Sequence, residues 1–138
     1  MSGCVFCEIV AGRTSAHVIA DEPLLLAFLD RTPLFPGHVL VVPRVHVVTL
    51  PELPAGDVGP FFERVQAIAR AVPAALGAQG TFVAMNNVVS QSVPHLHVHV
   101  VPRTKGDGLK GFFWPRTKYR SEEAMAETAA KIAASLSG

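Results

Sequence analysis

What this sequence lacks limits its possible roles before any motif is considered. No apolar run in it approaches the roughly 18 residues that a membrane-spanning helix needs. Its N-terminus lacks the basic and then apolar segments of a signal peptide. A formal net charge of +1 gives no strong field that would attract nucleic acid or an anionic membrane. These absences predict a cytoplasmic protein with no nucleic-acid partner and no membrane partner.

Internal repeats and low-complexity linkers are also absent, and 138 residues are a usual length for one domain. Hydrophobic residues make up 49% of the chain, which is enough to build a substantial core. The one shift in composition is a piece rich in glycine and lysine, from Thr104 to Gly111. We therefore expect a main domain followed by a short C-terminal extension.

The hydrophobic patterns predict an α+β fold with a mostly antiparallel sheet. Short apolar runs bounded by turn residues predict strands over residues 24–30, 38–43, 81–86 and 94–102. A short N-terminal helix should end at Gly12, and a last helix should be capped by Ser121. Asp57 is the expected cap of a long helix, which we expect to kink or end just before Pro73.

The run from Pro94 to Pro102 carries three histidines, His95, His97 and His99, which alternate with apolar residues. Residues two apart in a strand lie on one face, so the three imidazoles should form a row about 13 Å long. A row of imidazoles makes a poor core, but it suits contact with a phosphate or a metal ion. The pattern also allows the alternative that these histidines only bind a metal ion and take no part in catalysis.

The seven residues from His95 to Val101 match the signature of the histidine triad (HIT) nucleotide hydrolases and transferases at every position. Two further stretches resemble the same family. One is the run from Pro36 to His46, in which a histidine, an apolar strand, a proline and a basic residue precede the last histidine. The other is the loop before the triad, where Ser90 stands in place of the glycine that is usual in the family.

The resemblance implies the HIT fold, a five-stranded, mostly antiparallel sheet with a long central helix on one face and a C-terminal helix. It implies a HIT domain at residues 4–108 and an extension at residues 109–138 that packs on the same domain. It also implies a homodimer, since family members commonly pair their sheets edge to edge, and pairing protects exposed strands.

For catalysis, the resemblance implies that His97 attacks the α-phosphorus of a nucleotide and forms a nucleotidyl-histidine. An imidazole, whose usual pKa is about 6.5, is largely unprotonated at neutral pH and suits this task. Ser92, His99 and amides of the loop before the triad are expected to stabilise charge on the phosphoryl oxygens. His38 is expected to lie near them.

For nucleotide binding, the resemblance implies that Asp30 accepts hydrogen bonds from the ribose hydroxyls. Ordinary core packing is the alternative for the apolar candidates that would line the base slot, which are Phe6, Ile9, Phe28 and Leu29. Asn86 or Asn87 is expected to reach the ribose or the phosphates, and the other nucleotide-binding candidates are Gln91, Ser92 and His99.

Cys4 and Cys7 are the only cysteines, and they allow three interpretations. The strand that precedes a thioredoxin-type redox pair is absent here. A zinc site would need two further ligands. Some bacterial members of the family supply them from positions that correspond to His46 and His95, which implies one structural zinc ion, with free thiols as the alternative. No organic cofactor is expected.

The tail after the triad resembles the fragile-histidine-triad branch of the family, whose members cleave dinucleoside polyphosphates. The alternatives are a purine nucleoside phosphoramidase and a nucleotide-binding protein without enzymatic activity. The segment from Lys105 to Arg116 combines cations with large rings, namely Lys105, Lys110 and Arg116 with Phe112, Phe113 and Trp114. We expect its cations to bind a polyphosphate, unless its rings only anchor the tail.

Overall fold

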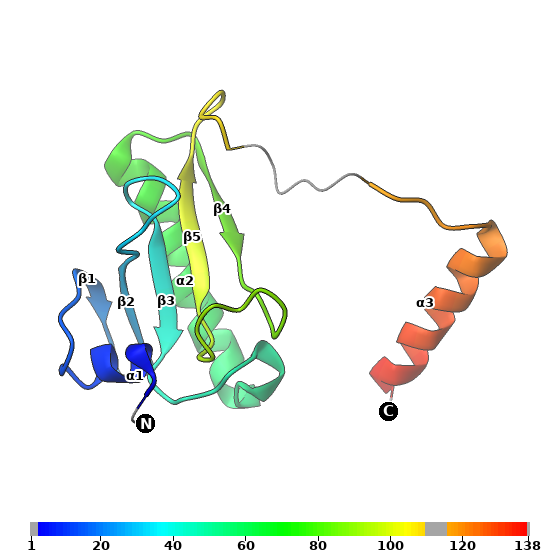
Figure 1. Cartoon of the computed structure of the whole chain (residues 1–138), viewed down its shortest axis with the longest axis horizontal. Helices are drawn as coiled ribbons and strands as arrows, with labels where there is room; N and C mark the ends of the chain where they lie inside the picture. Colours follow the sequence, from blue (N-terminus) through cyan, green and yellow to red (C-terminus); the bar gives the residue numbers. More distant parts are fainter. Residues whose placement is uncertain (1–2, 110–115, 138) are drawn as a thin grey trace. The chain divides into compact units, whose positions relative to one another are not determined.

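The computed structural model describes residues 3–109 and 116–137, which fall into two compact units, Met1–Asp107 and Gly108–Gly138. The first unit holds a five-stranded sheet in the order β1-β2-β3-β5-β4, in which every neighbouring pair is antiparallel (Figure 1). Its strands are β1 (Val18–Asp21), β2 (Leu25–Leu29), β3 (Val39–Pro43), β4 (Gly80–Ala84) and β5 (Val98–Arg103). The predicted fold class is thereby confirmed.

Two strands differ from the prediction. β1 was missed because Val18–Asp21 is a short edge strand whose residues are mostly exposed, and it carries an irregular register against β2. β5 begins at Val98, four residues later than the alternating pattern suggests, because the Leu96 N–H is donated to the carbonyl of Val47 at 2.7 Å instead of to a strand.

The long helix α2 (Ala55–Leu76) covers one face of the sheet (Figure 1). The expected end just before Pro73 is wrong, because the helix continues to Leu76 and is capped by Gly77, whose φ of 69° suits a helix terminus. The alternative expectation, a kink near Pro73, stays a prediction. Asp57 lies in the first turn and is not the cap, which is Pro54. The buried stripe that fixes the helix on the sheet consists of Phe61, Val65, Ile68 and Val72.

The opposite face of the sheet is covered in part by the short helix α1 (Val5–Val10). Side chains alternate between the two faces, so Leu25 and Ala27 pack toward α2 while Leu26 and Phe28 pack toward α1. A single turn of 3-10 helix, η1 (Leu50–Glu52), precedes α2. Among the described helices, none combines the length and hydropathy that a membrane-spanning segment needs.

The second unit holds the helix α3 (Glu122–Ser137). The predicted cap is confirmed, because the Ser121 hydroxyl accepts the Ala124 N–H at 3.1 Å. Most of the cationic and aromatic segment expected to bind polyphosphate, with Lys110, Phe112, Phe113 and Trp114, lies outside the described residues. Its role and the packing of the extension stay predictions.

Gly37, which precedes β3, has a φ of 99°, and a Cβ at this position would collide with Cδ1 of Leu76. Gly37→Ala should lower the free energy of unfolding by about 1–2 kcal/mol, because a side chain is strained in that region of φ. Gly56→Ala is the control, since Gly56 is exposed in α2, does not precede a proline, and has no atom of a non-neighbouring residue near its missing Cβ. That change should raise stability by about 0.5–1 kcal/mol. Urea denaturation measures both values, and equal effects would contradict the assignment.

Candidate active site

The register of β5 places its histidine on the face of the sheet that α1 partly covers. His99 lies opposite Leu40 of β3 and Ala84 of β4, and Leu40 belongs to the core cluster under α1. Leu96 and Val98 are fully buried on the α2 side, with a relative exposure of 0%. The imidazoles of the triad therefore lie on one side of the backbone and the apolar side chains on the other.

His97 is held in one tautomer by its own backbone neighbourhood. Its Nδ1 lies 2.8 Å from the carbonyl oxygen of His95, and a carbonyl can only accept, so Nδ1–H must donate. The edge of the Phe6 ring packs against the imidazole, with ring centroids 5.0 Å apart. Nε2 of the neutral ring therefore carries a lone pair, which is the form that a nitrogen nucleophile needs.

His38 and His99 form a hydrogen-bonded pair next to His97. The Leu34 N–H donates to Nδ1 of His38 at 3.0 Å, so a neutral His38 carries its proton on Nε2. This Nε2–H lies 2.9 Å from Nδ1 of His99 and donates to it. A neutral His99 must then carry its own proton on Nε2, where it is available to a ligand.

Burial keeps this pair neutral. Desolvation, with His97 and His38 nearby, lowers the pKa of His99 to about 4. Desolvation also lowers the pKa of His38, although the charge of Asp30 opposes it. Both rings are therefore uncharged at neutral pH. His99 thus offers a neutral N–H donor, and the centroid of its ring lies 5.0 Å from that of His97.

Asp30 follows β2 directly and lies beside His38, and its expected role in ribose binding stays a prediction. Its backbone N–H donates to the His38 carbonyl at 2.9 Å, and its Oδ2 lies 3.7 Å from Nε2 of His38. Oδ1 accepts the Thr32 N–H at 3.0 Å. The side chain is 20% exposed, so the carboxylate keeps capacity to accept hydrogen bonds from a ligand.

Phe6 and Phe28 meet edge to face beneath the triad, with centroids 5.6 Å apart, and both are buried. Both rings belong to the core cluster under α1, and Phe6 also packs against His97. Ile9 packs on the same cluster. Leu29 does not join them, because the alternation of β2 turns it to the α2 side of the sheet.

The loop before the triad uses two of the predicted ligand residues for its own structure. Asn87 Oδ1 accepts the Leu50 N–H at 2.7 Å, and Gln91 Nε2 donates to the Val48 carbonyl at 2.6 Å. Ser92 is exposed. Ser90, which stands where the family usually has glycine, has a φ of 63°, in the region that glycine adopts most easily.

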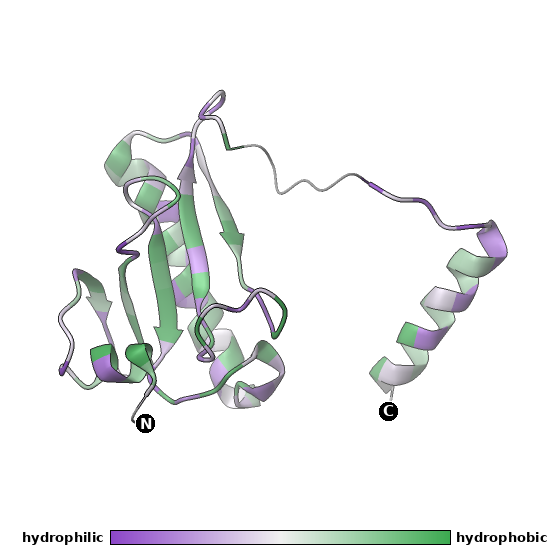
Figure 2. Cartoon of the chain, viewed as in Figure 1, coloured by the Kyte–Doolittle hydropathy of each residue, from purple (hydrophilic) through white to green (hydrophobic). Residues whose placement is uncertain are grey.

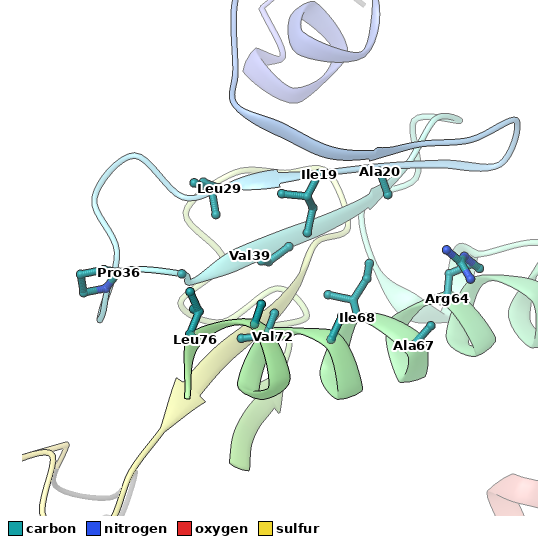
Figure 3. A pocket seen from close by; sticks show the side chains of 13 residues that line it. Ile19, Ala20, Leu29, Pro36, Val39, Arg64, Ala67, Ile68, Val72 and Leu76 are labelled. Atoms are coloured by element: carbon teal, nitrogen blue, oxygen red, sulfur yellow. The ribbon is translucent and has the colours of Figure 1, made fainter. Parts of the chain in front are cut away.

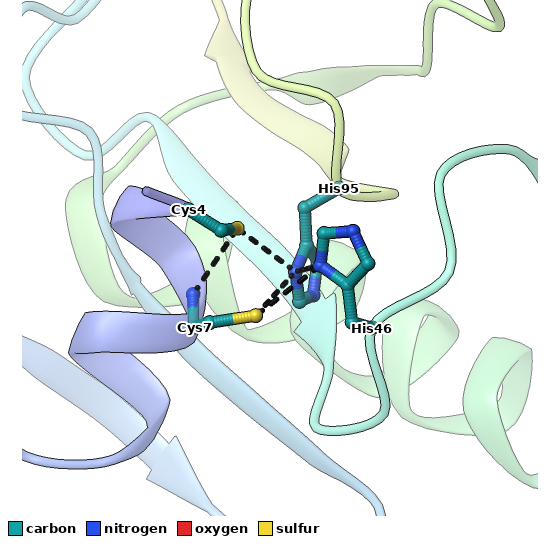
Figure 4. A group of neighbouring side chains, drawn as sticks. All are labelled: Cys4, Cys7, His46 and His95. Carbon is teal, nitrogen blue, oxygen red and sulfur yellow. Dashed lines mark hydrogen bonds between the residues drawn. The ribbon is translucent and has the colours of Figure 1, made fainter. Parts of the chain in front are cut away.

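Cys4, Cys7, His46 and His95 converge as a second cluster beside the triad (Figure 4). Nδ1 of His95 lies 3.5 Å from each sulfur and 3.2 Å from Nδ1 of His46, which is itself 3.2 Å from Cys7 Sγ. Bonds of about 2.0–2.3 Å to a tetrahedral zinc ion place ligand atoms about 3.3–3.8 Å apart. The cluster therefore fits a four-ligand metal site.

His95 presents the correct nitrogen to this cluster. Its Nε2 lies 2.9 Å from the Pro43 carbonyl and must donate to it, which leaves the Nδ1 lone pair for a metal. Burial lowers the pKa of His95, so the ring is neutral. Burial and the neighbouring Cys4 raise the pKa of the Cys7 thiol in the absence of a cation, which a metal would reverse.

Comparison with known proteins gives matches across most of the chain. The HIT domain family model matches residues 11–106. The adenosine 5'-monophosphoramidase hnt1 of Schizosaccharomyces pombe is 32% identical over 125 residues, which cover 89% of this chain and 91% of that protein. This relative therefore matches the chain over most of the length of both proteins.

Two solved structures have a similar fold. A member of the HIT family from Bacillus subtilis is 31% identical, with a TM-score of 0.87 over 96% of both chains. A zinc-bound histidine triad protein from Mycobacterium smegmatis is 36% identical, with a TM-score of 0.74 over 94% of this chain and 97% of that one.

NMR of histidine-labelled protein should show His99 titrating with a midpoint of about 4. Between the usual value of about 6.5 and this midpoint, the unfolded chain binds a proton at His99 that the folded chain excludes, so this group makes stability fall as the pH falls. The signal is assigned by its loss in His99→Asn. A midpoint near 6.5 would show that the ring is not desolvated as described.

Proposed function

The chain belongs to the HIT family, and on that premise we propose that it is a nucleotide hydrolase that works through a covalent intermediate on His97. The single observation that carries this proposal is the hydrogen bond from His97 Nδ1–H to the His95 carbonyl, which leaves Nε2 free. Two neutral histidines and a carboxylate beside it supply the donor and acceptors that a nucleotide requires.

In the first step, Nε2 of His97 attacks the α-phosphorus, a P–N bond forms, and the leaving group departs with the electrons of its bond to phosphorus. The ring gains positive charge as it is nucleotidylated. The His95 carbonyl stabilises that charge through the existing hydrogen bond at 2.8 Å. In the second step, water attacks the same phosphorus and the electrons of the breaking P–N bond return to Nε2 of His97. One proton of the water passes to solvent, and the nucleotide leaves.

The neighbouring groups complete the proposed site. His99 donates Nε2–H to a phosphoryl oxygen, and the exposed Ser92 hydroxyl and amides of its loop add further donors. Asp30 accepts the ribose hydroxyls, and Phe6 and Phe28 form the apolar wall for the base. Asn87 and Gln91 act indirectly in this proposal, because their amides hold the loop in place.

Two classes of leaving group remain for this chemistry. The tail beyond the triad supports dinucleoside polyphosphates, since cations in it would bind the departing phosphates. The similarity to a phosphoramidase, over 91% of that protein, supports a purine nucleoside phosphoramidate as the second candidate. The same attack by His97 serves both, because the two substrates share the nucleotidyl group.

We further propose that the cluster of Cys4, Cys7, His46 and His95 binds one zinc ion. Its geometry and the zinc-bound relative from Mycobacterium smegmatis support this assignment. When bound, the ion would supply structural cross-linking, since four protein ligands leave no open position for a substrate. A cytoplasmic homodimer without an organic cofactor is the form in which we expect the protein to act.

His97→Ala should lower kcat by roughly 10⁴-fold or more, because both steps depend on this ring. AMP should still bind, since the base, ribose and phosphate contacts of the proposal come from other residues. His17→Ala is the control, because His17 is exposed and lies outside the site. Turnover that survives in His97→Ala would refute the proposed nucleophile.

A comparison of kcat/KM for diadenosine polyphosphates and adenosine phosphoramidate separates the two substrate classes. On the evidence of the tail, the polyphosphates should react faster. A higher value for the phosphoramidate would reverse the choice of leaving group and leave the nucleophile unaffected. Binding of both classes without turnover of either would indicate a nucleotide-binding protein.

Metal analysis of protein purified without chelator should give about one zinc ion per chain. Cys7→Ser should lower both the zinc content and the melting temperature, because the ion joins α1 to two other segments of the domain. The Cys7→Ser chain should retain chemistry at temperatures where it stays folded. Metal-free protein of unchanged stability would contradict the zinc assignment.

A further inference from the structure

Helix α1 is attached to the domain through few buried side chains. Of its six residues, only Phe6 and Cys7 are buried. Phe6 packs on the rings of Phe28 and His97, and Cys7 belongs to the metal-binding cluster together with the cap residue Cys4. Isolated helices shorter than about 12 residues are marginal in water, so the folding of α1 depends on these contacts.

The sulfurs of Cys4 and Cys7 lie where a single covalent bond can join them. Cys4 is the N-cap of α1, and its Sγ accepts the Cys7 N–H at 3.4 Å. Both sulfurs point from α1 toward the two imidazoles of the cluster (Figure 4), and the four ligand atoms lie within 4.8 Å of one another. Residues three apart at the start of a helix are neighbours, so rotation of the two side chains can bring the sulfurs to the disulfide bond length of about 2.05 Å.

Zinc binding and disulfide formation compete for the same two sulfurs. The thiolate is the form of cysteine that binds a metal ion and also the form that attacks an oxidant. The chain has no other cysteine, and burial of Cys4 and Cys7, which are 6% and 8% exposed, opposes pairing with a second chain. Once the sulfurs are joined, His46 and His95 supply only half of the four ligands that a structural zinc ion needs.

On the premise of the zinc site proposed above, and independently of the hydrolase activity, we propose that Cys4 and Cys7 form a redox-sensitive pair. A peroxide oxidises the zinc-bound thiolates to a Cys4–Cys7 disulfide, and the ion leaves. Cys7 lies beside the half-buried His46, which is the more open side of the cluster, so its sulfur reacts first.

The oxidation proceeds in two displacements at sulfur and oxygen. The Cys7 thiolate attacks one peroxide oxygen, the O–O bond breaks, and hydroxide departs, which leaves a sulfenic acid. The Cys4 thiolate then attacks the sulfur of Cys7, the S–O bond breaks, and a second hydroxide departs. Two electrons pass from sulfur to the peroxide, and solvent protonates both hydroxide ions to water.

Loss of the ion separates α1 from the segments that carry His46 and His95. Figure 2 shows that β2 and β3, which lie next to this helix, are mostly hydrophobic. Their side chains under α1 include Leu26, Leu40 and Val42. Release of α1 exposes this apolar surface to water, so the oxidised protein should be less stable than the zinc-bound protein. In a reducing cytoplasm such a disulfide is transient, which makes the change reversible.

The residues after α1 provide a proteolytic measure of its release. The backbone N–H groups of Arg13 and Thr14 donate to the Glu8 carbonyl at 2.9 and 3.2 Å, and Arg13 Nε donates to the Glu8 carboxylate at 3.0 Å. Trypsin should therefore cut after Arg13 slowly while α1 is folded. A dye that detects apolar surface is less suitable, because an apolar groove of about 570 Å³ already lies between α2 and the sheet (Figure 3).

The test compares reduced, zinc-loaded full-length protein before and after treatment with hydrogen peroxide. A colorimetric chelator measures the released zinc, and complete digestion gives the peptide Met1–Arg13, which contains both cysteines. One zinc ion should be released for each peptide that has lost two hydrogen atoms. In the native protein, cleavage after Arg13 should become about tenfold faster or more. Cleavage after Arg120, in the second compact unit, is the internal reference and should not change.

The melting temperature should fall by about 5 °C or more on oxidation. Dithiothreitol followed by zinc should restore it, together with the zinc content. This thiol does not repair methionine sulfoxide, so recovery separates the cysteines from Met85, which packs against the core and is also open to oxidation. Cys4→Ser is the matched control, since it keeps one thiol and should yield no peptide with an internal disulfide.

Retention of zinc and of both free thiols after prolonged exposure to millimolar peroxide would overturn the proposal. Oxidation of the sulfurs to sulfinic acid instead of a disulfide, or a disulfide that forms while the ion stays bound, would overturn it as well. A disulfide with unchanged cleavage after Arg13 would show that the ion does not hold α1 in place. Reduced protein without zinc would refute the zinc assignment and the release with it, and would leave the hydrolase proposal unaffected.

Discussion

The arrangement of this site depends on one constraint, which is that each triad histidine has one ring nitrogen fixed by a hydrogen bond. Carbonyl groups accept from His95 and His97, and His38 donates to His99. Because each tautomer is fixed, each remaining nitrogen has a defined use. His95 faces the cysteine cluster with a lone pair, His97 presents a lone pair for attack, and His99 presents an N–H.

His95 joins the two clusters of the domain. Its ring belongs to the metal-binding geometry, while its carbonyl holds the proposed nucleophile. An ion bound by the cluster would connect α1, the segment after β3 and the start of the triad. The ion would thereby stabilise the fold around His95 without taking part in turnover. Phe6 packs on the rings of both His95 and His97.

Much of the fold and of the site was predictable from the sequence, because alternation and helical spacing are local. The triad face, the stripe of α2 and the convergence of Cys4 with His95 follow from such patterns and from the family resemblance. The tautomers were not predictable, since they depend on carbonyls and rings brought together by the sheet. The end of α2 predicted just before Pro73 was wrong because packing of the helix on the sheet outweighs one lost hydrogen bond. The strain at Ser90 is likewise visible only in the folded loop.

The central claim, a covalent nucleotidyl-histidine, is tested most directly by the stereochemical course at phosphorus. A substrate of the class that the protein turns over, made chiral at the α-phosphorus with sulfur and hydrolysed in ¹⁸O-labelled water, gives a nucleotide product whose configuration can be determined. Two successive in-line displacements, the first by His97 and the second by water, predict overall retention. Inversion would mean that water attacks the substrate directly, and it would contradict the proposed intermediate.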